Sequence, residues 1–200
     1  YPFISSTKYE LIEYGSEVSK LQSKALISEF DNQYYLLVAR IVPENNIDLI
    51  INAFIKSKSA DKLYIVGALD NSKYCQRIKN IQNIQICFLG SIYDQNKLLS
   101  LRQNALAAFH GHSVGGTNPS LLEAMSCRVP IFAHDNEFNK GVLLESGIYF
   151  SDLDDLVKKI NNFIDNNLDI SAKISSQIER ISNYFSHEII NAKYETLFDK

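Results

Sequence analysis

Short apolar runs recur along the middle of the chain and alternate with longer stretches that have helical spacing. The apolar runs cover residues 34–38, 63–66, 84–88, 105–109, 130–133 and 148–150. Almost every position in these runs is apolar, which is typical of strands buried on both faces. After the first run, apolar residues from Ile47 to Phe54 recur at intervals that fit one broad helix face. The pattern predicts an α/β fold, a Rossmann-like parallel sheet of about six strands flanked by helices, with further helices at the C-terminus.

The two ends of the chain have a different pattern. The stretch KYELIEY predicts one more strand over residues 8–14, and looser sequence follows it. We therefore expect residues 1–30 to be the remnant of a preceding N-terminal domain and its linker, and residues 31–168 to form the Rossmann-like domain. Residues 169–200 are expected to be a helical segment that packs toward the missing N-terminal domain, because its apolar stripe needs a cover. The stripe consists of Ile181, Tyr184, Phe185, Ile189, Tyr194 and Leu197.

The composition is typical of a globular domain and argues against several other classes of protein. Of the 200 residues, 46% are hydrophobic and 22% are charged, as in an ordinary globular domain. A net charge of −3 gives no electrostatic footprint for nucleic acid, so no nucleic-acid partner is expected. Cys75, Cys87 and Cys127 are odd in number and lack CxxC spacing, which argues against a disulfide framework or a zinc cluster and favours a cytoplasmic location. No apolar run approaches the roughly 20 residues of a membrane-spanning helix.

The stretch GHSVGG around Ser113 admits two chemical interpretations. As Gly-x-Ser-x-Gly it matches the nucleophile elbow of serine hydrolases, and a triad order is completed by Asp152, Asp154 or Asp155 and then His187. An elbow, however, needs a helix that begins almost at the serine, whereas the first helix-start signal here is the later NPSLLEAM. In addition, His187 lies within the amphipathic pattern of the last helix, while a catalytic histidine normally projects from a loop. The serine hydrolase is therefore kept as the alternative.

The same glycines fit a phosphate site. Gly115 and Gly116 stand just ahead of a helix that Asn118 and Pro119 are suited to begin, as N-cap and first helical residue. Unhindered N–H groups and the positive end of the helix dipole together attract anions. The site would lie beyond the carboxyl end of a parallel strand, where open α/β sheets bind their ligands. A glycine-rich turn without a ligand remains the other interpretation.

Several segments carry a family resemblance. Four stretches of this chain resemble the C-terminal, donor-binding domain of retaining GT-B glycosyltransferases (group 1 type). They are LLVARIVPENNIDLIINAF, IVG, FLGSIYDQNKLLSLRQNALAAFHGHSVGGTNPSLLEAM and VPIFAHD. More narrowly, this chain resembles the bacterial polysaccharide rhamnosyltransferases in the shorter motifs PENN, YDQ and HGHSVGGTNPSLLEAM. The resemblance runs from about residue 34 to 150. It implies a glycosyltransferase that transfers rhamnose from dTDP-rhamnose to a cell-surface polysaccharide.

The resemblance also implies partners. The nucleotide-sugar donor would bind to this chain without a metal or other cofactor, and the glycan or lipid-linked glycan acceptor would bind through the N-terminal domain. It leaves room for peripheral association of the full-length enzyme with the inner face of the membrane. Two alternatives from other classes stay open, namely the serine hydrolase with Ser113 and a nucleotide-binding module without catalytic activity. No catalytic residue is assigned to this chain.

Two positions match the diphosphate site of the family. Arg40 corresponds to an arginine after the first strand that contacts the donor diphosphate, and its planar guanidinium can bind two phosphate oxygens at once. A few residues later the wider family has a lysine as a second phosphate ligand, where this chain has Asn45, a neutral donor. Further donor contacts are expected from the loop residues Gly115, Gly116, Thr117 and Asn118.

The wider family also has two glutamates separated by seven residues. Glu123 matches the second, which accepts hydrogen bonds from the ribose, so with a thymidine nucleotide it would bind the 3′-hydroxyl. Gly115 stands in place of the first, near the transferred sugar, which leaves the mode of sugar recognition open. The residue types admit a structural role as well, because Ser120-Leu-Leu-Glu123 has the form of a capping box.

The remaining candidates lie at other strand ends. Tyr93 is expected near the nucleoside base, Gly67 at a neighbouring strand end, and His112 near the sugar. His110 and His112 have His-x-His spacing, but no third ligand accompanies them, so no metal site is assigned. The Asp-x-Asp motif at Asp152 is similar to the metal motif of other glycosyltransferases. Because it follows the last strand and opens a helix, N-capping explains it.

Overall fold

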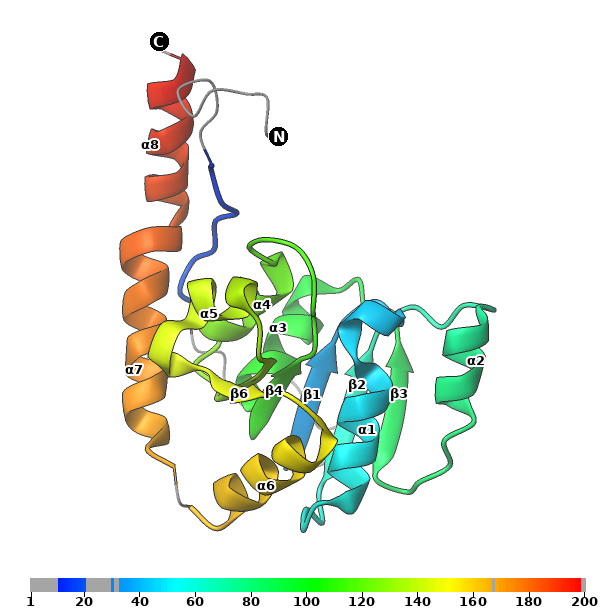
Figure 1. Cartoon of the computed structure of the whole chain (residues 1–200). Coiled ribbons are helices and arrows are strands. Elements are labelled where there is room, and N and C mark those ends of the chain that lie inside the picture. Colours follow the sequence, from blue (N-terminus) through cyan, green and yellow to red (C-terminus); the bar gives the residue numbers. More distant parts are fainter. Residues whose placement is uncertain (1–10, 21–29, 31–32, 167, 199–200) are drawn as a thin grey trace.

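Six parallel strands form one sheet in the computed structural model, which describes residues 11–20, 30, 33–166 and 168–198. The strands are β1 (Tyr34–Val38), β2 (Lys62–Val66), β3 (Ile86–Gly90), β4 (Ala107–His110), β5 (Ile131–His134) and β6 (Ile148–Phe150). Their order is β3-β2-β1-β4-β5-β6, and each neighbouring pair is parallel (Figure 1). The predicted Rossmann-like α/β fold is therefore confirmed. The strand order reverses between β1 and β4, where such sheets bind ligands.

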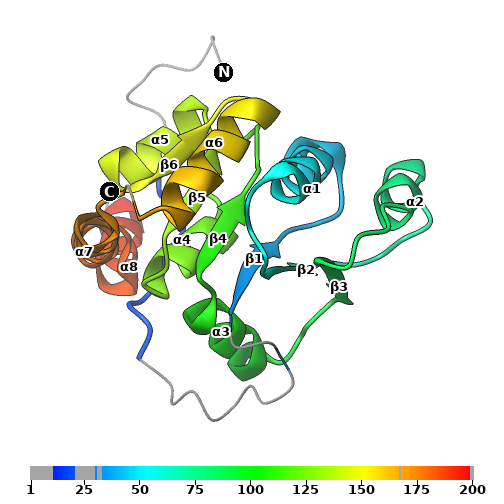
Figure 2. The same cartoon turned by 90° about the horizontal axis from the view of Figure 1, so that it is seen from below.

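Helices cover both faces of the sheet (Figure 2). They are η3 (Pro43–Asn45), α1 (Ile47–Lys56), α2 (Lys73–Lys79), α3 (Gln95–Asn104), α4 (Pro119–Ser126), α5 (Glu137–Leu143), η4 (Leu144–Ser146) and α6 (Leu153–Ile164). Helices α1 and α6 pack on one face, and α3 and α4 pack on the other. In β1, Tyr35 and Leu37 pack toward α1 and α6, whereas Tyr34 and Leu36 pack toward α3 on the opposite face. This alternation between two buried faces explains the continuous apolar runs.

One predicted strand is displaced along the chain. The sequence places it at residues 84–88, but β3 begins at Ile86, and Ile84 is 86% exposed. The strand lies at the edge of the sheet, and all its residues are only partly buried. The apolar but exposed Ile84 therefore extends the apolar run beyond the start of the strand. The other five strands agree with the prediction to within two residues.

The chain ends in a helical arm beside the sheet. It consists of α7 (Ile170–Arg180), the π-helical turn η5 (Ile181–Phe185) and α8 (His187–Phe198). Ile181 and Phe185 are buried against α4 and α5, so part of the apolar stripe is covered within this chain. Tyr184, Tyr194 and Leu197 are exposed instead. Among the described helices, none is long and apolar enough to cross a membrane.

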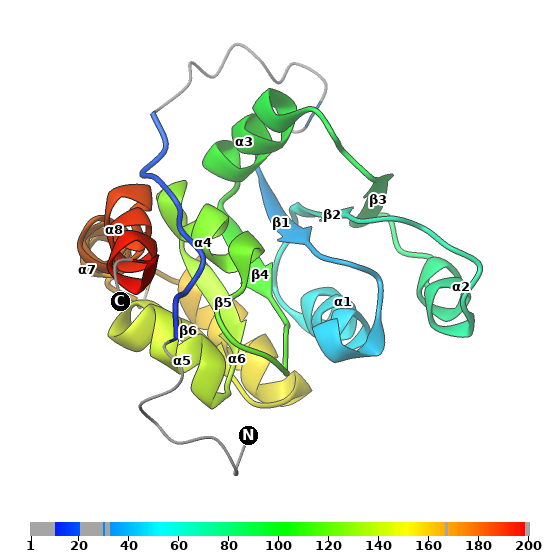
Figure 3. The same cartoon turned by 90° about the horizontal axis from the view of Figure 1, so that it is seen from above.

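The strand predicted over residues 8–14 is wrong for its described part. Residues 8–10 lie outside the described ranges, and residues 11–14 belong to no strand. The segment runs along the C-terminal arm instead (Figure 3). The Ser16 N–H donates to the Phe185 carbonyl over 2.7 Å, and Glu13 pairs with Lys193 at 2.7 Å. These partners are far away in the sequence, so the local pattern could not reveal them.

Candidate functional site

The carboxyl ends of the strands border two adjoining hollows. A cavity of about 150 Å³ lies between β1 and β4, and a wider groove of about 520 Å³ extends from it past β2 and β3. We call them the inner cavity and the outer groove. Both are lined by Val38, Ala39, Arg40, Asn118 and Ser120, so they form one continuous surface.

The structure brings most of the predicted site residues together on this surface. Those that line it are Arg40, Asn45, Gly67, Tyr93, His112, Asn118 and Glu123. The other three, Gly115, Gly116 and Thr117, lie in the loop between β4 and α4. In that loop Gly115 has a φ of +97°, a conformation that favours glycine. A Cβ at this position would lie 3.4 Å from the His112 Nε2, so the loop passes directly beside that ring.

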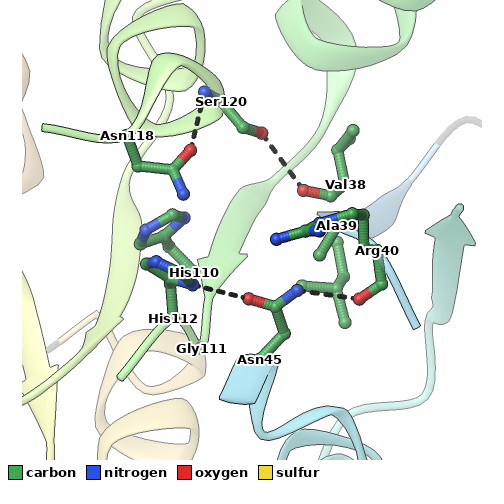
Figure 4. A pocket seen from close by; sticks show the side chains of 10 residues that line it. Val38, Ala39, Arg40, Asn45, His110, Gly111, His112, Asn118 and Ser120 are labelled. Carbon is green, nitrogen blue, oxygen red and sulfur yellow. Dashed lines mark hydrogen bonds between the residues drawn. The ribbon is translucent and has the colours of Figure 1, made fainter. Parts of the chain in front are cut away.

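Nitrogen-bearing side chains point into the inner cavity from opposite sides (Figure 4). Arg40 follows β1, and its guanidinium extends toward the rings of His110 and His112. Asn118 is the N-cap of α4, as predicted, and its Oδ1 accepts from the Ser120 N–H over 2.9 Å. With the oxygen bound to the helix, the amide nitrogen faces the cavity. Because the positive end of the α4 dipole lies there as well, the cavity suits an anion.

Asn45 is a buried residue of the inner cavity that connects Arg40 to His112. It is 6% exposed, its Nδ2 donates to the Arg40 carbonyl over 2.8 Å, and its Oδ1 lies 2.9 Å from the His112 Nδ1. Asn45 thus fixes the Arg40 backbone and the His112 ring, and its expected contact with phosphate stays a prediction. Because Oδ1 can only accept, the His112 Nδ1 carries the proton. The neutral ring therefore leaves Nε2 unprotonated.

The two histidines differ in burial. His110 ends β4, is 7% exposed, and its Nε2 has no partner among the described residues. Burial, with His112 and Arg102 nearby, lowers the pKa of His110 to about 3. His112 is half-buried, and its ring centre lies 6.0 Å from that of His110. Burial and the Arg40 charge lower the pKa of His112, while Glu44 acts in the opposite direction.

The β4–α4 loop is anchored to η3. A Cβ on Gly111 would lie 2.1 Å from the Asn45 carbonyl oxygen, so glycine is needed for the two backbones to pass this closely. The N–H and the hydroxyl of Ser113 both donate to the Glu44 carbonyl, each over 2.9 Å.

The residues of the hydrolase alternative are not brought together. Ser113 donates its hydroxyl to the Glu44 carbonyl, whereas the histidine candidate, His187, begins α8, where its Nδ1 lies 3.6 Å from the Glu17 Oε1. Since a nucleophile needs its base within hydrogen-bonding reach, this geometry argues against the serine hydrolase.

The buried Arg102 cation binds two polar side chains of the outer groove. Arg102 on α3 has a side chain 4% exposed and donates to a Glu123 carboxylate oxygen over 2.6 Å and to the Ser120 Oγ over 3.3 Å. The Ser120 hydroxyl in turn donates to the Val38 carbonyl over 3.1 Å. The capping-box interpretation of Glu123 is therefore wrong, because Asn118 already binds the Ser120 N–H. The Glu123 carboxylate, 51% exposed, is held by Arg102 at the groove.

The far side of the outer groove comes from the ends of β2 and β3. Gly67 follows β2, and its N–H donates to the Gly90 carbonyl over 2.9 Å, so it offers surface rather than a free donor. Tyr93 follows β3, lines the groove and is 86% exposed. An exposed aromatic ring in this place is suited to pack against a planar ligand.

The side chains that could bind a metal ion are dispersed over the described part of the chain. The described residues contain no group of three or more His, Cys, Asp or Glu side chains that could hold a metal ion. Asp152 is the N-cap of α6 and accepts from the Asp155 N–H over 2.9 Å, as N-capping predicts. The Asp-x-Asp motif therefore has a structural use here.

Two features of the site are not indicated by the sequence. Arg102 looks like an ordinary basic residue in the last turn of a helix, and only the fold buries it beside Glu123. The contact between Asn45 and His112 joins positions 67 residues apart. Neither pair has a sequence spacing that would indicate it.

Solved glycosyltransferase structures share this architecture. The sucrose-phosphate synthase of Thermosynechococcus elongatus superposes with a TM-score of 0.82 and 18% identity, over 95% of this chain and 52% of its own. A glycosyltransferase of Rickettsia africae gives 0.82 and 16%, over 98% and 57%. Anabaena HepE, solved in complex with UDP, gives 0.71 and 18%, over 84% and 50%. At these identities the likeness establishes the GT-B type of fold alone.

Sequence comparison adds the family. An α-1,3/1,6-mannosyltransferase of Kluyveromyces lactis is 25% identical over an alignment that covers 100% of this chain and 48% of the relative. The chain thus spans about half the length of the relatives it matches. The profile described as glycosyl transferases group 1 matches residues 19–181. With most of its length matched, and with a groove at the carboxyl ends of a Rossmann-like sheet, this chain belongs to the group 1 glycosyl transferase family.

Proposed function

We propose that this chain is the donor-binding domain of a two-domain glycosyltransferase that transfers rhamnose from dTDP-rhamnose to a cell-surface polysaccharide. The observation that carries the proposal is the inner cavity, where the Arg40 guanidinium and the Asn118 amide nitrogen converge beside the N-terminus of α4. A charge-assisted fork and an amide donor suit the oxygens of a diphosphate. The Gly115-containing loop, which passes beside His112, would supply further N–H groups.

The nucleoside half of the donor fits the outer groove. Arg102 occupies one Glu123 oxygen, so the other is available to accept from a ribose or deoxyribose 3′-hydroxyl. Tyr93, at the far side, would pack on the base. A nucleotide-sugar ligand, though not its placement, is supported by Anabaena HepE, which has been solved with UDP and with UDP-glucose. Diphosphate and nucleoside would thus occupy the inner cavity and the outer groove in continuity.

The identity of the sugar rests on the motif HGHSVGGTNPSLLEAM, which resembles rhamnosyltransferases. The Kluyveromyces relative carries the name of a mannosyltransferase instead. Gly115 takes the place of the glutamate that the wider family has near the sugar, and His112 stands beside it. The sugar site that we propose would thus have the His112 imidazole beside the position where the wider family has a carboxylate.

Catalysis would need a second domain and no metal. Arg40 and the α4 dipole supply the positive potential that a divalent ion would otherwise provide. Because the chain spans about half of its relatives, we assign the acceptor site to another domain, near the exposed side chains of α8. The full-length enzyme would work in the cytoplasm, at the inner face of the membrane.

Calorimetry tests the donor assignment. The chain is titrated in EDTA with dTDP-rhamnose, UDP-glucose, GDP-mannose and the matching nucleoside diphosphates. We expect binding without a divalent ion and the highest affinity for the thymidine nucleotides. Binding that requires Mg²⁺ or Mn²⁺ contradicts the metal-independent site, and a preference for GDP-mannose contradicts rhamnose.

A transfer assay tests the division into domains. This chain and the full-length enzyme are incubated separately with dTDP-rhamnose and a glycan acceptor. We expect product from the full-length enzyme alone, because an open cleft neither positions the acceptor nor excludes water. Comparable product from this chain would show that the acceptor site lies within it.

A further inference from the structure

We infer that His112, oriented by Asn45, takes up a proton when a nucleotide sugar binds and so supplies the second positive charge that faces the diphosphate. The inference rests on the proposed function, since it concerns the same cavity. It assigns to His112 a role in binding the diphosphate, in addition to a position near the sugar. It also makes donor affinity dependent on pH within the physiological range.

The inner cavity has fewer permanent positive charges than a diphosphate has negative charges. The described residues that line the inner cavity are Leu37, Val38, Ala39, Arg40, Asn45, His110, Gly111, His112, Asn118 and Ser120. Among them Arg40 alone carries a permanent charge. The diphosphate of a nucleotide sugar carries two negative charges, and a partly enclosed site does not screen the excess well. His110 and His112 are the two lining groups that can gain a charge by protonation.

Geometry selects His112 over His110. The two ring centres are 6.0 Å apart, so a charge on one opposes a charge on the other. His110 is 7% exposed and pays the larger desolvation cost on protonation. His112 is half-buried, and its Nδ1 proton is already bound by Asn45. A new proton would therefore arrive at Nε2, which faces the loop at Gly115.

The surroundings of His112 favour a neutral ring until a ligand binds. Arg40 and burial disfavour its charged form, and Glu44 favours it. From the side of α5, Asn136 and Asn139 donate to the His112 carbonyl over 2.9 Å each and carry no charge. Two phosphate charges in the cavity would outweigh the repulsion from Arg40 and raise the pKa of the ring. Binding and protonation are then linked.

The experiment measures proton uptake by calorimetry of the full chain. Binding of dTDP-rhamnose and UDP-glucose is followed between pH 5.5 and 8 in buffers of different ionisation enthalpy. Nucleotide sugars are used because a terminal phosphate itself titrates near pH 6. We expect uptake of up to about one proton per ligand and affinity about tenfold higher at pH 6 than at pH 8. Thymidine and uridine, which lack phosphate, should show neither effect.

Three histidine variants and one direct signal assign the proton. His112→Gln should abolish the uptake and keep nucleoside affinity, whereas His187→Gln, an exposed histidine on α8 that does not line the cavity, should leave the uptake unchanged. In the unmodified chain, ¹⁵N NMR should show the His112 Nε2 gaining a proton on binding. Binding without uptake, or uptake that survives His112→Gln or disappears in His110→Gln, overturns the inference. Failure of every nucleotide sugar to bind at any pH overturns the proposed function instead.

Discussion

The inner cavity and the outer groove bury polar groups in opposite ways. In the inner cavity the buried side chains, Asn45 and His110, are neutral, and the cation Arg40 is exposed. In the outer groove the buried side chain is itself the cation Arg102, and its partner Glu123 is half-exposed. A buried ionisable group keeps its charge only where a counter-charge is fixed beside it. Each region follows this rule with different residues.

The difference implies a division of labour along one surface. The Arg102–Glu123 pair is satisfied within the protein, so it should contribute mainly to folding and to the shape of the groove. The Arg40 guanidinium points into open space, so its electrostatic energy is realised only when an anion arrives. Changes in the inner cavity should therefore alter mainly diphosphate binding, whereas changes at the ion pair should alter stability and, through the second Glu123 oxygen, nucleoside binding.

Arg40→Ala should produce the largest change in binding. The loss of charge-assisted hydrogen bonds of roughly 1.5–3 kcal/mol corresponds to about a ten- to a hundredfold weaker affinity for dTDP. Thymidine affinity should change little, because the nucleoside lies in the outer groove. Calorimetry with both ligands measures the two effects.

Arg77→Ala is the matched control, since Arg77 is an exposed arginine that pairs with Asp48 away from the site. It should leave dTDP affinity unchanged. Arg40→Ala should also unfold at the same temperature as the unmodified chain, because substitutions of exposed side chains cost little. A lower melting temperature without weaker binding would show that Arg40 is structural.

Glu123→Ala should have the largest effect on stability. It leaves the Arg102 cation, 4% exposed, without its carboxylate, at a cost of about 2 kcal/mol in the free energy of unfolding. This is below the cost for a fully buried pair, because Glu123 is screened by water. Arg102→Met removes the buried charge instead and should cost less, about 1 kcal/mol. Urea unfolding of both variants measures the asymmetry, and equal losses would contradict it.

His110 should make stability fall in acid by a smaller amount. The pKa of its folded state is about 3, below the unfolded value of about 6.5. The unfolded state therefore binds more protons between these values. Its contribution is complete above pH 6.5, and about 1.4 kcal/mol of it is lost by pH 5.5. Urea unfolding at pH 5.5 and 7.5 should show a smaller difference for His110→Gln than for the unmodified chain. An unchanged difference would mean that His110 is not buried in its neutral form.

The fold was predictable where local pattern and burial agree. The strands of the sheet centre are apolar at almost every position because helices cover both their faces, and Asn118-Pro119 marks the start of α4 directly. The edge strand β3 was misplaced because the exposed Ile84 extends its apolar run. Residues 11–14 were assigned to a strand, although Glu13 and its neighbours bind the C-terminal arm. Local sequence carries no information about such a distant partner.

The candidate site divides in the same manner. Asn118 could be predicted from the helix-start pattern, whereas Arg40 is indicated by the family resemblance at the end of the first strand. The pairs of Arg102 with Glu123 and of Asn45 with His112 depend on which strands become neighbours. Their residue types are ordinary, and only burial gives them a role. Supporting contacts of this kind require the fold.

Asn118→Ser should give the smallest effect and the sharpest separation of binding from stability. A serine at the N-cap keeps an oxygen that can accept from the Ser120 N–H, so α4 should be as stable as before. It lacks the amide nitrogen that faces the inner cavity, and the loss of one hydrogen bond corresponds to about a three- to tenfold weaker affinity for dTDP. Asn118→Ala loses both groups and should add a decrease of about 1 kcal/mol in stability. If the serine variant bound dTDP as tightly as the unmodified chain, Asn118 would be a helix cap alone. The inner cavity would then depend on Arg40 and the loop N–H groups.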